Sequence, residues 1–114
     1  MDALTPLLIA KALDGLTARA EATAVNIANA NSPGYRPLKV DFEGRLRAAA
    51  GDGAAAIDAV RPDVTTLAPT RLAPDMRLDL ELATAWQTSM RYAALIDLLG
   101  REMAISRAAL AGGR

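Results

Sequence analysis

The stretch Asn26-Ile27-Ala28-Asn29-Ala30-Asn31-Ser32-Pro33-Gly34-Tyr35-Arg36 decides how this chain is organised. It ends a helical repeat, because asparagine tolerates left-handed backbone geometry. Proline then removes an N–H donor and disfavours a helical conformation in the residue before it. Proline followed by glycine is also the preference of a type II turn. The sequence therefore predicts an N-terminal helical segment over residues 1–32 that closes in a tight turn.

Upstream of this turn, apolar and small residues repeat every 3.5 positions. Thr5 is suited to cap a helix, and Pro6 is suited to the first helical position, which predicts a helix over 6–30. Gly15 weakens this helix by about 1 kcal/mol relative to alanine. Such spacing is typical of a coiled-coil seam, which here consists of Ile9, Leu13, Leu16, Ala20, Thr23, Ile27 and Ala30.

A second and longer repeat occupies residues 75–114. Asp75 is suited to cap a helix over 76–110, which would be roughly 52 Å long. The seam consists of Leu82, Ala85, Ser89, Tyr92, Ile96, Leu99, Met103, Ser106 and Leu110. More apolar residues lie off this seam than one short partner helix can cover, and exposed apolar patches mark interaction surfaces. We therefore expect several neighbours, most of them other chains.

The middle segment, residues 33–74, lacks helical periodicity. Alternation at Leu38, Val40 and Phe42 indicates a strand, or a strap lying across another surface, with a short helix expected after it. Glycines and prolines over 48–74 indicate a mobile connector with room for a short hairpin around 57–72. The predicted fold is all-α, in which elongated N- and C-terminal helices pair as a coiled coil around an irregular or extended middle, in one domain.

Composition argues against catalysis, nucleic-acid binding and a membrane-spanning segment. The 13 basic and 13 acidic residues cancel, whereas nucleic-acid binders present a basic face. Without histidine or cysteine, the chain lacks the commonest general base and metal ligands. We expect no enzyme, cofactor or metal. No apolar stretch is long enough to span a membrane. Asp2 stands where a signal peptide is basic, so a cleaved signal is not expected.

The pattern leaves two architectures open. One is an ordinary antiparallel helical hairpin with its own core, and the other is a protomer of an assembly. Small seam residues such as Ala20 and Ser89 permit close helix contacts but fill little core volume. They favour assembly, as does the apolar excess of the second helix. A small helical adaptor or chaperone that binds one partner helix is the alternative function.

Two segments resemble bacterial flagellar basal-body rod proteins. The first is Asn26 to Arg36 followed by Val40-Asp41-Phe42-Glu43, and the second is Met90-Arg91-Tyr92-Ala93-Ala94-Leu95-Ile96-Asp97-Leu98-Leu99. The resemblance covers roughly residues 10–47 and 76–111. It is closest to proximal rod proteins of the FlgB type, which the short connector also favours.

The resemblance implies a structural subunit that polymerises helically into the torque-transmitting rod. It implies a place in the periplasmic part of the basal body, reached by type III export without signal cleavage. The partners it implies are further copies of the chain, rod proteins such as FlgC, the FliE adaptor and the export gate. Together with the two seams, it predicts these subunit-interface residues: Leu13, Leu16, Asn26, Ile27, Asn29, Asn31, Pro33, Gly34, Tyr35, Phe42, Trp86, Tyr92, Ile96, Leu99 and Met103.

Overall fold

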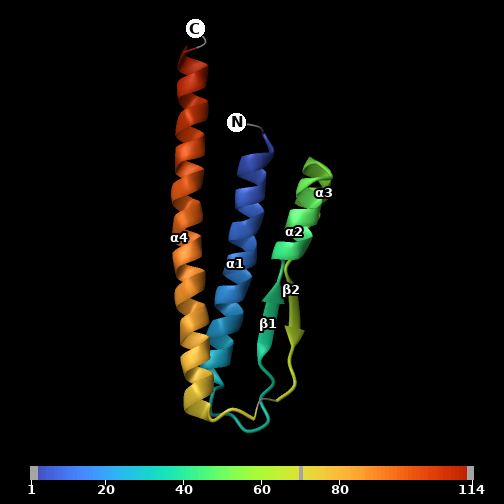
Figure 1. Cartoon of the computed structure of the whole chain (residues 1–114), viewed down its shortest axis with the longest axis vertical. Coiled ribbons are helices and arrows are strands. Elements are labelled where there is room, and N and C mark those ends of the chain that lie inside the picture. The colour runs from blue at the N-terminus through green and yellow to red at the C-terminus, as the bar shows by residue number, and fades with distance from the viewer. Residues whose placement is uncertain (1–2, 70, 113–114) are drawn as a thin grey trace.

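Two long helices and a small mixed module make up the chain (Figure 1). The structure, a computed structural model, describes residues 3–69 and 71–112. In chain order the elements are α1 (Leu4–Ala28), β1 (Leu38–Asp41), α2 (Glu43–Ala50), α3 (Ala54–Asp58), β2 (Asp63–Thr66) and α4 (Pro74–Gly112). The prediction of long terminal helices that pack together is confirmed. The all-α prediction is only approximate, because a two-stranded sheet is present.

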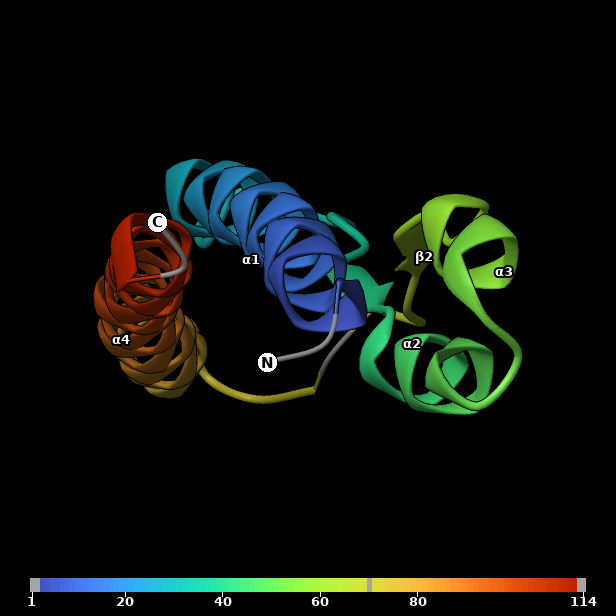
Figure 2. The same cartoon turned by 90° about the horizontal axis from the view of Figure 1, so that it is seen from above.

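The molecule is elongated, with principal extents of 64 × 25 × 14 Å. Helix α1 lies in the middle, with α4 on one side and the sheet, α2 and α3 on the other (Figure 2). Helices α1 and α4 run antiparallel, and α4 extends beyond the start of α1 (Figure 1). At 1.5 Å per residue the 39 residues of α4 span about 58 Å, so this one helix sets the length of the molecule.

The hydrophobic core lies between α1 and the module that follows it. Its buried members are Leu16, Ala22, Val40, Phe42, Leu46, Ala49 and Ile57. Helix α4 adds only the partly buried Leu95 to this cluster. Among the described residues of α4, Thr88 alone is fully buried. The core therefore belongs to the first sixty residues, and α4 rests on its outside.

The segment predicted to be a mobile connector, residues 48–74, contains the end of α2, helix α3 and strand β2. Strand β2 pairs antiparallel with β1, from Leu38 opposite Thr66 to Asp41 opposite Asp63. Helices α2 and α3 come between the two strands in the sequence. The Ile57 side chain of α3 is completely buried. The hairpin predicted around 57–72 is therefore wrong. Strand β2 lies in the middle of that range, and its partner strand lies upstream of α2, where no local turn signal reveals it.

Both predicted helix starts are wrong by one or two residues. Helix α1 follows Ala3 as its N-cap, so Thr5 lies inside the first turn. Helix α4 begins at Pro74, and the Arg77 N–H donates to the Ala73 carbonyl over 3.0 Å. Proline is favoured in the first helical turn because its φ is already helical. Asp75 therefore lies in the first turn, where its charge still complements the helix dipole.

Candidate subunit interface

Asn26 is the best-connected residue of the motif that ends α1. Its side-chain amide donates to the Leu38 carbonyl over 2.9 Å and to Glu81 Oε1 over 3.2 Å. Its Oδ1 accepts from the Leu38 N–H over 2.9 Å and from the Tyr35 hydroxyl over 2.6 Å. The side chain is almost fully buried, so losing a partner would leave a polar group unpaired. Asn26 thus joins α1, the start of β1 and α4 at one point.

The turn after α1 has the predicted geometry. Gly34 has a φ of 71°, and the Tyr35 N–H donates to the Ser32 carbonyl over 3.2 Å. A positive φ at the third residue and this hydrogen bond are those of a type II turn. Asn29 closes the helix end by donating to the Val25 carbonyl.

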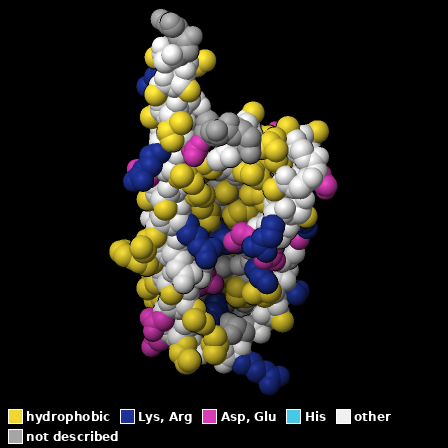
Figure 3. Space-filling view, turned by 45° about the horizontal axis from the view of Figure 1, so that its top comes forward, with side chains coloured by type: hydrophobic (Ala, Val, Ile, Leu, Met, Phe, Trp, Pro, Cys, Tyr) yellow, Lys and Arg dark blue, Asp and Glu magenta, His cyan; other side chains and the backbone are white. Residues whose placement is uncertain are grey.

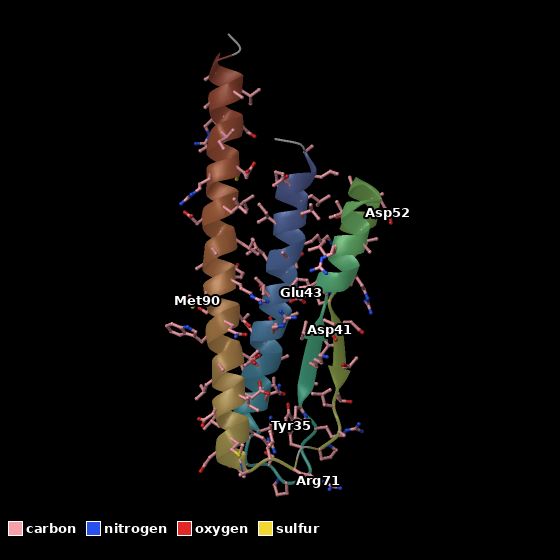
Figure 4. The ribbon with its side chains drawn as sticks, viewed as in Figure 1. Tyr35, Asp41, Glu43, Asp52, Arg71 and Met90 are labelled. Atoms are coloured by element: carbon pink, nitrogen blue, oxygen red, sulfur yellow. The ribbon has the colours of Figure 1, made fainter. Side chains whose placement is uncertain are left out.

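The tip of this turn is exposed to solvent. Asn31, Pro33 and Gly34 are exposed, whereas Asn29 and Tyr35 are half-buried. Figure 4 shows Tyr35 beneath the end of α1. Burial raises the pKa of its hydroxyl, which therefore stays a hydrogen-bond donor to Asn26.

Phe42 holds the module against α1. Its ring packs where a Cβ on Gly15 would stand, so α1 has glycine there because the ring occupies the space. The Arg19 guanidinium lies over the same ring, 5.0 Å from its centroid. It also donates to Glu43 over 2.7 and 2.8 Å and to the Val40 carbonyl over 2.7 Å. A two-pronged contact of this kind is among the stronger side-chain interactions.

Glu43 connects three helices. Besides Arg19 of α1, Arg91 of α4 lies 3.6 Å from its carboxylate, and Figure 4 shows Glu43 beside α1 at the start of α2. Hydrogen bonding from Arg19 lowers the pKa of the Glu43 carboxyl to about 2. Sequence reasoning missed Arg19 and its bond to Glu43. The signal was its spacing, because Arg19 lies seven residues before Asn26 and so shares its helical face.

Only part of each predicted seam is shielded from solvent. The series Ile9, Leu16 and Thr23 of α1, with Ala30 just after the helix, is buried, but Leu13, Ala20 and Ile27 are half-buried or exposed. In α4 Ala85, Leu99 and Ser106 are half-buried, whereas Tyr92 of the same series is exposed. The other series, Leu82, Ser89, Ile96, Met103 and Leu110, is exposed. The less exposed face of α4 is therefore rotated by part of a turn from the predicted seam.

Polar contacts explain this rotation. The contact face of α4 is completed by Glu81, Thr88, Leu95 and Glu102, each seven residues after the last. Glu81 accepts from Asn26, and Arg77 donates to the Asn29 carbonyl over 3.3 Å. The Thr88 hydroxyl donates a hydrogen bond to the Thr84 carbonyl, so the Thr88 side chain can be buried without an unpaired donor. These hydrogen bonds set the rotation of α4 about its own axis, and the spacing of apolar residues in the sequence does not reveal it.

Most of the predicted interface residues on α4 remain uncovered. The exposed fractions are 69% for Trp86, 52% for Met103, 47% for Ile96 and 39% for Tyr92. Figure 3 shows hydrophobic side chains scattered along the projecting α4 and gathered in the hollow beside it. In contrast, Leu16, Asn26 and Phe42 are already buried within the chain. The surface still open to a neighbour is therefore mainly that of α4.

An apolar groove opens between α1 and α4, and residues from both halves of the α4 seam line it. One hollow of about 490 Å³ is lined by Ala20, Ala24, Ile27, Ala85, Ser89 and Tyr92, among others. A second, of about 560 Å³, is lined by Pro6, Ala10, Leu99, Met103, Ser106, Arg107 and Leu110. On α1 the residues Pro6, Ala10, Ala20, Ala24 and Ile27 fall within an arc of about 100°, since each residue turns the helix by about 100°. Both hollows therefore lie on one side of the helix pair.

An open groove between two helices and an exposed helix face are the main surface features of the described residues. In residues 3–69 and 71–112, no three acidic, histidine or cysteine side chains are placed to hold a metal ion. Within the same residues, neither long helix is apolar enough over its length to cross a membrane. In comparisons with known proteins, no family model and no curated protein matches this chain. The site is thus defined by its own geometry: a capped turn, an open groove and an uncovered helix.

Proposed function

We propose that this chain is a structural subunit of the bacterial flagellar basal-body rod, of the proximal FlgB type. It would polymerise through its terminal helices into the shaft that transmits torque. The observation that carries the proposal is α4, a helix of 39 residues with one fully buried side chain. Its exposed large apolar residues include Leu80, Leu82, Trp86, Met90, Ile96, Met103, Ile105 and Leu110.

The energetics favour covering this helix with other protein. Fully burying a large apolar side chain contributes about 1.5–3 kcal/mol, so several such residues form a substantial drive toward association. The exposed residues continue along the whole of α4 rather than gathering in one patch. A surface of that shape suits lengthwise packing of many copies.

The turn motif supports the same proposal. Four hydrogen bonds to Asn26 hold the end of α1, Tyr35 and β1 in one arrangement. The exposed tip at Asn31, Pro33 and Gly34 is therefore presented on a rigid base. In a rod this tip would dock on the next subunit. The neighbours we propose are further copies, FlgC-type rod proteins, the FliE adaptor and the export gate, in the periplasmic space.

A genetic test addresses the proposal directly. In a flagellated bacterium without its own proximal rod protein, expression of this chain should restore swimming, and the chain should be found in isolated basal bodies. A Leu99→Asp variant should be expressed but fail in both respects, because a charge would enter the α1–α4 contact. Expression of the unaltered chain without swimming or incorporation would contradict the proposal.

The groove favours a second candidate, an adaptor or chaperone that holds one partner helix. Its small residues, such as Ala20, Ala24 and Ser89, leave room for a single helix. Sedimentation over a range of concentrations and electron microscopy separate the two functions. A rod subunit gives growing polymers, whereas an adaptor remains small and forms one defined complex.

A further inference from the structure

We infer that the groove between α1 and α4 receives α4 of a second copy, through the stripe formed by Leu82, Trp86 and Met90. This inference rests on the proposed structural function and names the contact by which copies would join. The stripe residues are 49%, 69% and 58% exposed. They are spaced four residues apart, so they form one continuous ridge about 12 Å long.

The groove calls for a helix as its occupant. Its walls repeat at three- and four-residue intervals on both sides, as at Ala20, Ala24 and Ile27 of α1 and at Ala85 and Ser89 of α4. Both helices carry seam residues, spaced 3.5 positions apart, that no other helix covers. Such a pair has the form of a helical bundle from which one helix is missing. A third helix that fits this spacing would complete it.

The small residues of the groove specify large residues on that helix. Alanine and serine line its middle, and close packing requires large side chains opposite small ones. Trp86 and Met90 are large side chains of the size that could fill the space beside these small groove residues. Tyr92 also lines the groove, and a methionine sulfur next to an aromatic ring is a favourable contact.

The described chain itself supplies this helix. Apolar residues of α1 that face away from α4 are already covered by β1, α2 and α3. Helix α4 instead leaves its large side chains uncovered over most of its length. Of its exposed apolar residues, the Leu82–Trp86–Met90 ridge is not interrupted by a polar side chain, whereas the polar Gln87 and the charged Arg91 separate Leu80 from Leu98 on the other flank.

The ridge cannot enter the groove of its own molecule. Met90 lies on the side of α4 away from α1 (Figure 4), while the groove opens between the two helices. A contact between two different faces is head-to-tail, so each added copy leaves one ridge and one groove free. Such a contact produces an open-ended assembly rather than a closed dimer.

Cysteine cross-linking tests this contact, because the natural chain has no cysteine. Full-length Ala24→Cys chain is mixed with full-length Met90→Cys chain under mild oxidation. We expect a disulfide-linked pair that carries one cysteine from each variant, since a disulfide requires Cα atoms within about 7 Å. The matched control is Leu80→Cys, which is as exposed as Met90 at 58% but lies about 15 Å away along α4. It should not link to Ala24→Cys.

Two further variants address the groove and the ridge separately. Ala24→Trp fills the groove at an exposed position, and Trp86→Ala shortens the ridge. Each should raise the concentration needed for self-association at least tenfold. Ala48→Trp, at an alanine of α2 that is also exposed, should leave that concentration unchanged. Circular dichroism shows whether each variant keeps the helical content of the unaltered chain.

The possible outcomes separate this inference from the proposed function. Self-association with cross-linking only through Leu80→Cys, or through neither cysteine, overturns the groove contact but leaves a polymerising subunit intact. A chain that stays monomeric at every concentration and does not restore swimming overturns both. Cross-linking through Met90→Cys without restored swimming supports the contact and contradicts the flagellar function.

Discussion

At Gly15, helix propensity and packing oppose each other. Alanine is favoured over glycine in a helix by about 1 kcal/mol, but a Cβ on Gly15 would overlap the Phe42 ring. Overpacking a core typically costs about 1–3 kcal/mol. We expect Gly15→Ala to lower the free energy of unfolding, measured by urea denaturation. Gly100→Ala is the matched control, because a Cβ there meets nothing within 4 Å. It should leave stability unchanged or raise it, and equal effects at both positions would contradict the Phe42 packing.

Glu43 should make stability depend on pH in acid. Its pKa is about 2 in the folded chain, against an ordinary value of 4.5, so the unfolded chain binds the proton more readily. The stabilisation by ionised Glu43 is therefore complete above about pH 4.5 and is lost as the pH falls toward 2. We expect Glu43→Gln to be less stable than the natural chain at pH 6 and to show a flatter decline between pH 4.5 and 2. Denaturation at several pH values measures this difference, and parallel curves for the two proteins would rule out the Arg19–Glu43 contact.

At the scale of the element, the turn after α1 depends on the backbone of Gly34. A φ of 71° lies in the left-handed region, which costs a residue with a side chain about 1–2 kcal/mol. Gly34→Val should destabilise the chain by about that amount or more, because valine is also branched at Cβ. A Cβ on Gly34 meets no atom within 4 Å, so the loss would come from backbone conformation alone. Gly44→Ala, in the helical α2 and equally uncrowded, serves as the control and should not reduce stability in thermal unfolding.

The long helices were predictable from sequence because their signals are local. The 3.5-residue repeats and the Asn-Ser-Pro-Gly stop identified α1 and α4 to within two residues at each end. The short elements between them were less predictable, because non-local contacts hold them. Helix α3 is a five-residue helix that depends on the buried Ile57, and β2 pairs with a strand on the far side of two helices.

The 3.5-residue repeats also did not predict how α1 and α4 are rotated about their own axes. Both series of each seam look equivalent in the sequence, but the bonds from Asn26 to Glu81 and from Arg77 to Asn29 bring only one of them into the α1–α4 contact. The motif around Asn26 was recognised as a turn. Its role as a junction of three elements depends on contacts with Leu38 of β1 and Glu81 of α4, which are distant in the sequence.

At the scale of the whole molecule, the core and the long helix differ in how firmly they are held. The core joins α1 to β1, α2 and α3, whereas α4 contributes only a partly buried Leu95 to it. Regions with few buried apolar contacts open at a lower free energy than the core does. An α4 that opens easily in the free chain would become fixed when neighbouring copies cover it.

Hydrogen exchange should reveal this difference in the unaltered chain. In dilute solution, we expect backbone amides of residues 79–112 to exchange faster than those of residues 16–26, since the latter lie in the buried part of α1. At concentrations that support assembly, the amides of α4 should become protected, while those of α1 change little. Mass spectrometry of peptides from both segments, at two concentrations, measures this. Equal protection of α1 and α4 in dilute solution would mean that the α1–α4 contact is as stable as the core. The exposed apolar residues of α4 would then be a surface feature of a rigid monomer and not an assembly surface that orders on association.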